Sequence, residues 1–257
     1  MKVVEIATSP RDGIDLGSLQ NALDTLDVRA CIVMSNFQNP LGALMPNEKK
    51  RELVTMLAKT NTPLIEDDVY TELYFSKTKP RPAKSFDRSG LVLHCGSFAK
   101  SLAPGARIGW VIPGRFKSEI ERLKFITTIS TASLPQAALV EYLKHGGYER
   151  HLRGFRQRLS AALAAMTQAV TTYFPPGCRL TQPQGGYMLW VEMPEPIDAL
   201  KLHRLALADG ISIAPGPLFS VKRRYQNFVR LNYGHFEAKS TVNAVQTLGR
   251  LSVDLLR

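Results

Sequence analysis

Apolar runs and amphipathic stretches alternate along the first half of the chain. The apolar runs have the length of buried strands and lie near residues 1–8, 30–35, 63–67, 90–95 and 106–112. Residues 15–27 and 46–60 show helical periodicity, and Pro46 suits the first position of the second helix. This alternation predicts an α/β domain with a mainly parallel sheet.

The second half of the chain has a different pattern. Residues 116–174 predict almost continuous helix, with breaks near Pro135 and at Gly146-Gly147. A smaller α+β unit follows, with strands expected at 178–182, 186–192, 211–214 and 227–233, a helix near 197–209 and a closing helix. We therefore expect two domains, residues 1–145 and 146–257, with the last long helix spanning both.

Composition agrees with a protein that has a real core. The chain has 257 residues, of which 44% are hydrophobic and 21% charged. It contains no apolar run of about 18 residues, which predicts that no segment spans a membrane. The three cysteines lack paired spacing, which fits a reducing cytoplasm, and the five histidines lack zinc-ligand spacing, which predicts no metal site.

The net charge of +11 raises the question of nucleic acid or another anionic ligand. The basic residues, however, are scattered. The runs at residues 49–51 and 222–224 are short, and the cluster at 150–158 lies on an expected long helix. The pattern favours a solvated helix face over a nucleic-acid surface.

Three polar clusters directly follow predicted strands. They are Asn36–Gly42, Glu66–Tyr70 and the segment from Ser97 to Arg107. Ligands bind at the carboxyl ends of the strands in open α/β sheets. The three clusters are therefore expected at one edge of one sheet.

The third cluster suggests a specific cofactor. The amine of Lys100 can form a Schiff base with an aldehyde, while the Ser97 hydroxyl and the Arg107 guanidinium suit a phosphate. An aldehyde cofactor that carries a phosphate is pyridoxal 5'-phosphate (PLP). Ser-x-x-Lys also occurs in penicillin-binding-type serine enzymes, but the Ser-Asp-Asn and Lys-Thr-Gly elements of that class are absent here. A lone lysine can also be an ordinary surface charge, so the interpretation depends on the other clusters.

Together these motifs resemble a known family. Asn-Pro-x-Gly at 39–42, Asp-x-x-Tyr at 67–70, Ser-x-x-Lys at 97–100 with Arg107, and Arg230 near the end resemble fold-type I PLP-dependent aminotransferases of class I/II. The phrase around Lys100 is most similar to the aminotransferase-like domain of MocR regulators, a group of GntR-type transcription regulators.

The resemblance implies an α/β PLP-transferase large domain with a mainly parallel sheet, followed by a smaller C-terminal α+β domain. In the family, a glycine-rich phosphate-binding turn and a residue that stacks on the cofactor ring precede the point that matches residue 1. We therefore expect an incomplete, N-terminally truncated large domain.

The resemblance also implies roles for residues that would contact the cofactor. Lys100 matches the Schiff-base lysine, and Asp67 matches the aspartate that pairs with the pyridine nitrogen. Tyr70 and Asn39 match the pair that hydrogen-bonds the 3' oxygen of the ring. Taken alone, Asp67 or Asp68 could be a helix cap, and the choice of Asp67 rests on the Asp-x-x-Tyr spacing.

The remaining matches concern phosphate and substrate. Ser97 and Arg107 match the phosphate ligands, and Arg230 matches the arginine that holds the substrate α-carboxylate, with Asn39 beside it. An ordinary strand arginine is the alternative for Arg230, and a common turn residue before proline is the alternative for Asn39.

Three functions remain open at this stage. The first is amino-group transfer between an amino acid and a 2-oxo acid through a lysine Schiff base. The second is a sensing domain of a regulator, which binds PLP and an amino compound without turnover. The third is a truncated remnant that binds no cofactor. The resemblance further implies a homodimer, and DNA binding only through an upstream domain outside this chain.

Overall fold

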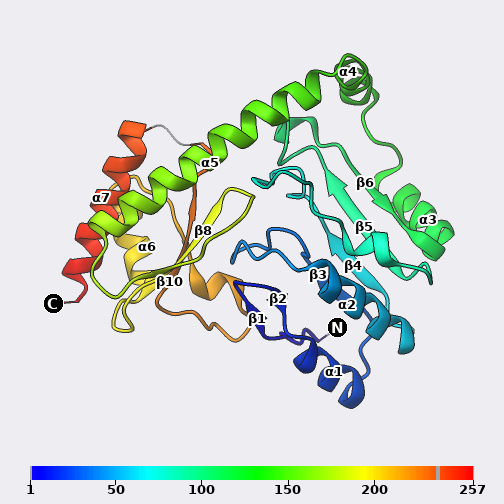
Figure 1. The fold of residues 1–257 in the computed structure, drawn as a ribbon, viewed down its shortest axis with the longest axis horizontal. Coiled ribbons are helices and arrows are strands. Elements are labelled where there is room, and N and C mark those ends of the chain that lie inside the picture. Colours follow the sequence, from blue (N-terminus) through cyan, green and yellow to red (C-terminus); the bar gives the residue numbers. More distant parts are fainter. Residues whose placement is uncertain (1, 236–237, 257) are drawn as a thin grey trace. The chain divides into compact units, whose positions relative to one another are not determined.

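The computed structural model describes residues 2–235 and 238–256, which form two compact units (Figure 1). Unit 2 contains Ile6–Gln38 and Ala43–Arg156. Unit 1 contains Gln157–Arg257 together with the short segments Met1–Glu5 and Asn39–Gly42. Each unit has its own sheet and is described by itself below.

Unit 2 is built on a four-stranded sheet in the order β3-β4-β5-β6. Its strands are β3 (Cys31–Val33), β4 (Leu64–Asp67), β5 (Val92–Ser97) and β6 (Gly109–Ile112). The first three strands are parallel and β6 is antiparallel to β5. The sheet is therefore mainly parallel, as the alternating pattern predicts.

Helices α1 (Leu16–Thr25) and α2 (Asn47–Lys59) pack on one face of this sheet and enclose its core. Alternate residues of the three parallel strands contribute to this core, among them Cys31, Val33, Leu64 and Val92. The members with the least exposure, at 0–1%, are Leu53, Leu57, Leu64, Ala83 and Val92. Burial of these side chains is the main favourable term that holds unit 2 together.

Local signals explain where the helices begin. Asp15 caps α1 by accepting a hydrogen bond from the Ser18 amide at 2.6 Å. Pro46 occupies the cap position of α2, one residue before the first helical position predicted for it.

Pro135 does not break the helix that contains it, because it lies in the first turn of α4, where backbone amides have no helical acceptor. The break lies between α3 (Lys117–Thr128) and α4 (Ser133–Lys144).

Unit 1 contains an antiparallel four-stranded sheet in the order β7-β8-β10-β9. The strands are β7 (Arg179–Leu180), β8 (Met188–Glu192), β9 (Ala214–Pro215) and β10 (Phe228–Asn232), and the helices are α6 (Ala199–Ala208), α7 (Ala238–Asp254) and the second part of α5 (Gly147–Tyr173). This unit corresponds to the expected smaller α+β unit.

Two expected strands differ from the observed ones. Residues 2–7 form no strand, and only Thr8–Ser9 (β1) pairs with Gly13–Ile14 (β2) in a short hairpin. Residue 1, also part of that expected strand, lies outside the described residues. A strand is expected at residues 211–214, but the observed strand β9 contains only Ala214–Pro215. The chain enters a 3-10 helix, Gly216–Phe219, directly after it. Proline has no backbone N–H to donate to a neighbouring strand, which is why prolines in sheets occur mainly on edge strands. Pro215 lies on the edge strand β9.

The division between the units also differs from the expected one at residues 145 and 146. It lies between Arg156 and Gln157, inside α5. The first turns of α5 pack in unit 2, where the Tyr148 hydroxyl hydrogen-bonds Ser101 Oγ at 2.8 Å and Leu152 is fully buried. A continuous helix therefore contributes to both units, and side-chain contacts determine where the division falls.

Gly249 gives a test of helix packing in unit 1. Gly→Ala inside a helix normally stabilises a protein by about 1 kcal/mol. Here a Cβ at Gly249 of α7 would lie 2.2 Å from the carbonyl oxygen of Tyr173 in α5. We expect Gly249→Ala to lower the free energy of unfolding by about 1–3 kcal/mol, measured by urea denaturation.

The control is Gly17→Ala in α1, where the new Cβ would lie 3.5 Å from Asp15 Oδ1, an ordinary contact. We expect this variant to unfold at the same or a slightly higher urea concentration. Wild-type stability in Gly249→Ala would contradict the close approach of the two helices.

Candidate functional site

The predicted cofactor residues of unit 2 lie at the ends of neighbouring strands. Asp67 is the last residue of β4, Ser97 is the last residue of β5, and Lys100 lies in the turn that follows. The parallel register pairs Asp67 with Cys95, so both strands end at the same edge of the sheet. The structure thus brings Asp67 and the segment from Ser97 to Lys100 together, as predicted from the sequence.

Aromatic packing and backbone bonds fix the turn that carries Lys100. The Phe98 ring lies 4.9 Å from the Trp110 ring and 5.5 Å from the Tyr148 ring, measured between centroids. The amides of Leu102 and Ala103 both donate to the Phe98 carbonyl oxygen, at 2.9 and 3.0 Å. The Lys100 side chain itself is exposed and projects from this rigid turn.

Asp67 is half-buried, and burial raises the pKa of its carboxyl above the ordinary value. The Val69 amide and the positive charge of Lys100 oppose this rise. The Lys100 ammonium is therefore close enough to act electrostatically on Asp67. A carboxylate and an amine that influence each other at a strand edge are suited to proton transfer and to binding a cationic ring.

Ser97 and Arg107 lie on the two sides of the same turn. The Ser97 hydroxyl donates to the Ile108 carbonyl oxygen at 3.1 Å and accepts from the Ala99 amide at 3.0 Å. Arg107 is exposed and has a left-handed backbone, with φ of 54°. Such a conformation is uncommon for a residue other than glycine and is often found at ligand-binding positions.

Tyr70 is 5% exposed and lies just after β4. Its carbonyl oxygen accepts a hydrogen bond from the Leu73 amide at 2.8 Å, which closes the turn after the strand. The structure therefore places Tyr70 near the edge of the sheet where β4 ends, with its side chain buried.

The two predicted substrate residues, Asn39 and Arg230, contact each other in unit 1. Arg230 lies on β10, between β8 and β9, and its NH1 group donates to Asn39 Oδ1 at 2.8 Å. Its guanidinium also lies 5.0 Å from the centre of the Phe219 ring, and its buried Nε has no hydrogen-bond partner among the described residues. An oriented guanidinium with an unused donor is suited to a carboxylate.

The predicted residues therefore fall into two groups. Unit 2 holds Asp67, Tyr70, Ser97, Lys100 and Arg107, and unit 1 holds Asn39 and Arg230.

The sequence analysis missed a buried polar network behind Asp67. It consists of Asn36, Lys50, Glu66, Asp68 and His94, all of which are buried. Lys50 Nζ donates to Asn36 Oδ1 at 2.6 Å, and Asn36 Nδ2 donates to Asp68 Oδ1 at 2.8 Å. Helical spacing could have revealed Lys50, because it lies on the same face of α2 as the buried residues Leu53, Val54 and Leu57.

Glu66 is the most fully hydrogen-bonded member of this network. Its Oε1 accepts from Ser35 Oγ and the Ala83 amide, each at 2.5 Å, and its Oε2 accepts from the Lys84 amide at 2.9 Å. Burial alone would raise the pKa of Glu66, but these bonds and His94 outweigh it and lower the pKa below 4.5.

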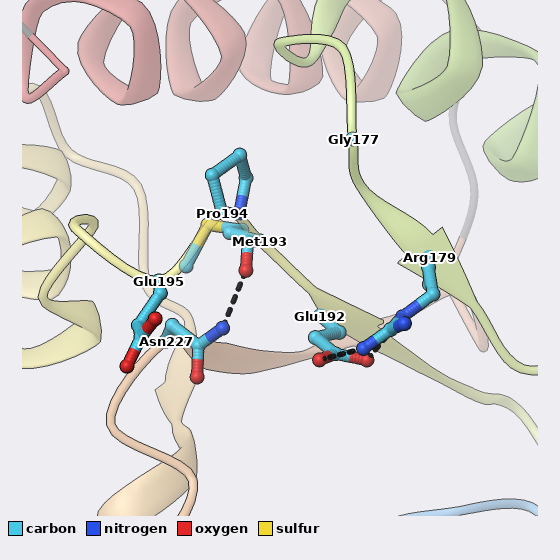
Figure 2. A pocket seen from close by; sticks show the side chains of 7 residues that line it. All are labelled: Gly177, Arg179, Glu192, Met193, Pro194, Glu195 and Asn227. Atoms are coloured by element: carbon cyan, nitrogen blue, oxygen red, sulfur yellow. Dashed lines mark hydrogen bonds and ion pairs between the residues drawn. The ribbon is translucent and has the colours of Figure 1, made fainter.

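Unit 1 also contains a pocket that is separate from the predicted site residues (Figure 2). It has a volume of about 460 Å³ and is lined by Gly177, Arg179, Glu192, Met193, Pro194, Glu195 and Asn227. Its polar groups largely satisfy one another: the Arg179 guanidinium pairs with Glu192, and the Asn227 amide donates to the Met193 carbonyl oxygen. None of the predicted site residues lines this pocket.

No cluster of three or more histidine, cysteine, aspartate or glutamate side chains in the described part of the chain is arranged to hold a metal ion. No helix in residues 2–235 and 238–256 is long and apolar enough to cross a membrane.

Comparison with known proteins identifies the family. Residues 1–248 match the aminotransferase class I and II family. The chain belongs to this family. The resemblance predicted from the motifs around Lys100 and Arg230 is therefore confirmed, and so is the aminotransferase-like character of the protein.

Relatives in the family include both regulators and enzymes. The chain is 45% identical to the uncharacterized HTH-type transcriptional regulator YdcR of Escherichia coli (strain K12), over 98% of this chain and 54% of YdcR. It thus spans about half the length of that relative. This similarity confirms the predicted resemblance to transcription regulators.

Solved structures confirm the PLP-transferase fold. LysN, the α-aminoadipate aminotransferase of Thermus thermophilus, superposes with a TM-score of 0.92 at 28% identity, over 98% of this chain and 66% of LysN. The multiple substrate aminotransferase of Thermococcus profundus gives a TM-score of 0.91 at 28% identity, over 98% of this chain and 64% of that protein.

Glu66 gives a test of the buried network. In Glu66→Gln, an NH2 group must face one of the donors that the carboxylate now accepts from. We expect a loss of about 1–3 kcal/mol in the free energy of unfolding at pH 7. Because the folded pKa of Glu66 lies below its ordinary value of 4.5, its contribution is present above pH 4.5 and disappears as the pH falls through the folded pKa.

Urea denaturation at several pH values measures this difference. The gap between wild type and Glu66→Gln should narrow below pH 4.5. Glu52→Gln, an exposed position on α2, is the control and should match the wild type throughout. A gap that stays constant on acidification would show that the Glu66 carboxylate is not stabilised in the folded state.

Proposed function

We propose that this chain binds PLP covalently through Lys100. The observation that carries the proposal is the exposed Lys100 amine in the turn after β5, together with the half-buried Asp67 carboxylate at the end of the neighbouring strand β4, both at the carboxyl edge of a sheet in an aminotransferase-family fold. The LysN structure, which is a complex with N-(5'-phosphopyridoxyl)-L-leucine, supports it.

The donor set of unit 2 fits this cofactor. When bound, PLP supplies an aldehyde that condenses with amines and a pyridine ring that withdraws electrons from the substrate. Asp67 would hold the proton of the pyridine nitrogen, and Tyr70 would donate to the 3' oxygen. Ser97 and Arg107 would bind the phosphate.

Lys50 is a second lysine with unusual surroundings, but it is not suited to this role. Burial lowers the pKa of Lys50 to about 8, which would favour a reactive amine. However, its side chain is fully buried and donates to Asn36 Oδ1 at 2.6 Å and to the Arg81 carbonyl oxygen at 2.7 Å. Lys100 is exposed and carries no such constraint, so it is the lysine that a cofactor can reach.

We propose further that Arg230 and Asn39 bind the α-carboxylate of an amino acid, and that Lys100 would move a proton from the substrate Cα to C4′ of the cofactor, and in the reverse direction in the second half of the cycle. The products of such a cycle are a 2-oxo acid and, in the second half, a new amino acid. Amino-group transfer is therefore the first candidate activity.

A second candidate is a sensing domain without turnover, and the 45% identity to the regulator YdcR favours it. In that case the same residues bind PLP and an amino compound, and a DNA-binding domain outside this chain responds. Under both candidates we propose a homodimer in the cytoplasm. Release of 2-oxo acid from a bound amino acid, measured over many cycles, distinguishes the enzyme from the sensor.

Lys100→Ala tests the cofactor site. Purified protein mixed with PLP should develop an absorbance band near roughly 410–430 nm, and borohydride should then fix the cofactor on Lys100, located by peptide mass spectrometry. Lys100→Ala should show neither result. Lys117→Ala, at a side chain that is 71% exposed, is the control and should behave as the wild type. Reduction-stable PLP in Lys100→Ala would refute the assignment.

Arg230→Lys tests the carboxylate contact. Because a lysine cannot form the paired bonds of a guanidinium, we expect amino-acid affinity to fall by about 10- to 100-fold. The readout is the absorbance change of the PLP-loaded protein titrated with a panel of L-amino acids that includes L-leucine. Arg204→Lys, at an exposed position in unit 1, is the control. Equal affinity in Arg230→Lys and wild type would remove Arg230 from the site.

A further inference from the structure

The end of β4 presents its side chains to opposite faces of the sheet. Glu66 and Asp68 are buried among the elements that cover one face, while Asp67 is half-buried. His94, at the neighbouring strand β5, lies between the two buried carboxylates. Its Nδ1 is 3.2 Å from Glu66 Oε2, and its Nε2 is 3.9 Å from Asp68 Oδ2. One imidazole thus bridges the residues on both sides of Asp67.

The charges of this cluster balance only if it holds an additional proton. Glu66 and Asp68 contribute two negative charges, and Lys50, linked to Asp68 through the Asn36 side chain, contributes one positive charge. Without a further proton, a buried region would carry a net negative charge, which is strongly unfavourable. A proton on His94 or on Asp68 makes the cluster neutral.

Other charged groups near His94 do not provide this balance. His94 faces Glu66 of β4 and Asp68, which directly follows β4. Lys50 of α2 belongs to the same cluster, and Lys84 of the 3-10 helix Ala83–Phe86 also acts on His94. Lys84 already pairs with Asp87 at 2.9 Å and donates to the Val92 carbonyl oxygen at 2.6 Å.

The pKa directions agree with a retained proton. Burial alone would lower the pKa of His94, but the hydrogen bond with Glu66 and the charge of Asp68 outweigh it and raise that pKa. Burial and the charge of Glu66 raise the pKa of Asp68 to about 7. The pair therefore binds one proton more tightly in the folded protein than in the unfolded chain.

We propose that His94 is a positioning residue for Asp67: one proton held on His94 or on Asp68 keeps the cluster of the two buried carboxylates neutral, and His94 between them thereby fixes the strand end that carries Asp67. This inference rests on the proposed function of Asp67 as the partner of the PLP ring. The backbone provides the connection, because the Asp68 amide donates to the Cys95 carbonyl oxygen at 2.9 Å beside the paired residues Asp67 and Cys95.

The proposal predicts a loss of PLP affinity at alkaline pH. A raised pKa contributes stability that is present below the unfolded value of 6.5 and is lost as the pH rises through the folded pKa of His94. Above that point Glu66 and Asp68 repel each other with no proton between them, and the strand end that holds Asp67 is displaced.

Two measurements on matched variants test this. In the protein without PLP, NMR titration of the His94 imidazole should give a midpoint above 6.5, and Asp68→Asn should lower it by about one pH unit or more. In a second measurement, the affinity of the protein for PLP is determined at several pH values from the absorbance of the bound cofactor. Across the His94 titration, wild type should lose about tenfold more PLP affinity than His94→Gln.

His145→Gln is the control, because His145 is exposed at the end of α4 in the same unit. It should keep the wild-type profile. Asp68→Asn should flatten the profile as His94→Gln does, since the cluster then no longer requires the proton. Asp68→Asn therefore carries the test if His94→Gln fails to fold.

The outcomes separate the two proposals. If wild-type protein takes up no PLP on Lys100, the proposed function fails and the positioning role fails with it. If PLP binds on Lys100 and both variants keep the wild-type pH profile, only the positioning role of His94 is overturned. A wild-type His94 midpoint at or below 6.5 would also overturn it, by showing that no proton is retained.

Discussion

The parallel pairing of β4 with β5 is the constraint on which unit 2 depends. It aligns Asp67 with Cys95 and so brings the ends of both strands to one edge of the sheet. The Glu66 carboxylate at the end of β4 contacts His94 of β5 at 3.2 Å and also accepts hydrogen bonds from residues of the segments after β3 and β4. A buried carboxylate without these donors would cost several kcal/mol, so the surrounding chain must adopt this arrangement around it.

Successive side chains at the end of β4 point to opposite faces of the sheet, so that the buried acids have a structural role and the half-buried acid is available for chemistry. Glu66 and Asp68 are buried in the polar network, whereas Asp67 is half-buried and responds electrostatically to Lys100. Spacing to Tyr70 alone favoured Asp67 over Asp68 in the sequence. The hydrogen bond from Asn36 to Asp68 at 2.8 Å supports the same choice, because it engages Asp68 inside the core.

Unit 1 uses a different means to orient its candidate group. Arg230 lies on β10, which pairs on both sides, so its backbone is fixed by two ladders. The Asn39 oxygen and the Phe219 ring then restrict the guanidinium. A short segment from the first half of the chain, Asn39–Gly42, thus belongs to the same compact unit as the C-terminal residues.

The sequence by itself determined the order of strands and helices between residues 15 and 112, the family, and the residue types of the candidate site. These follow from local periodicity and short motifs, which depend on neighbours along the chain. Tertiary structure alone decided that Lys50 is buried although it belongs to a run of basic residues, that His94 lies between Glu66 and Asp68, and that the units divide inside α5. The physical reason is that burial and charge pairing depend on residues far apart in sequence, which no local pattern records.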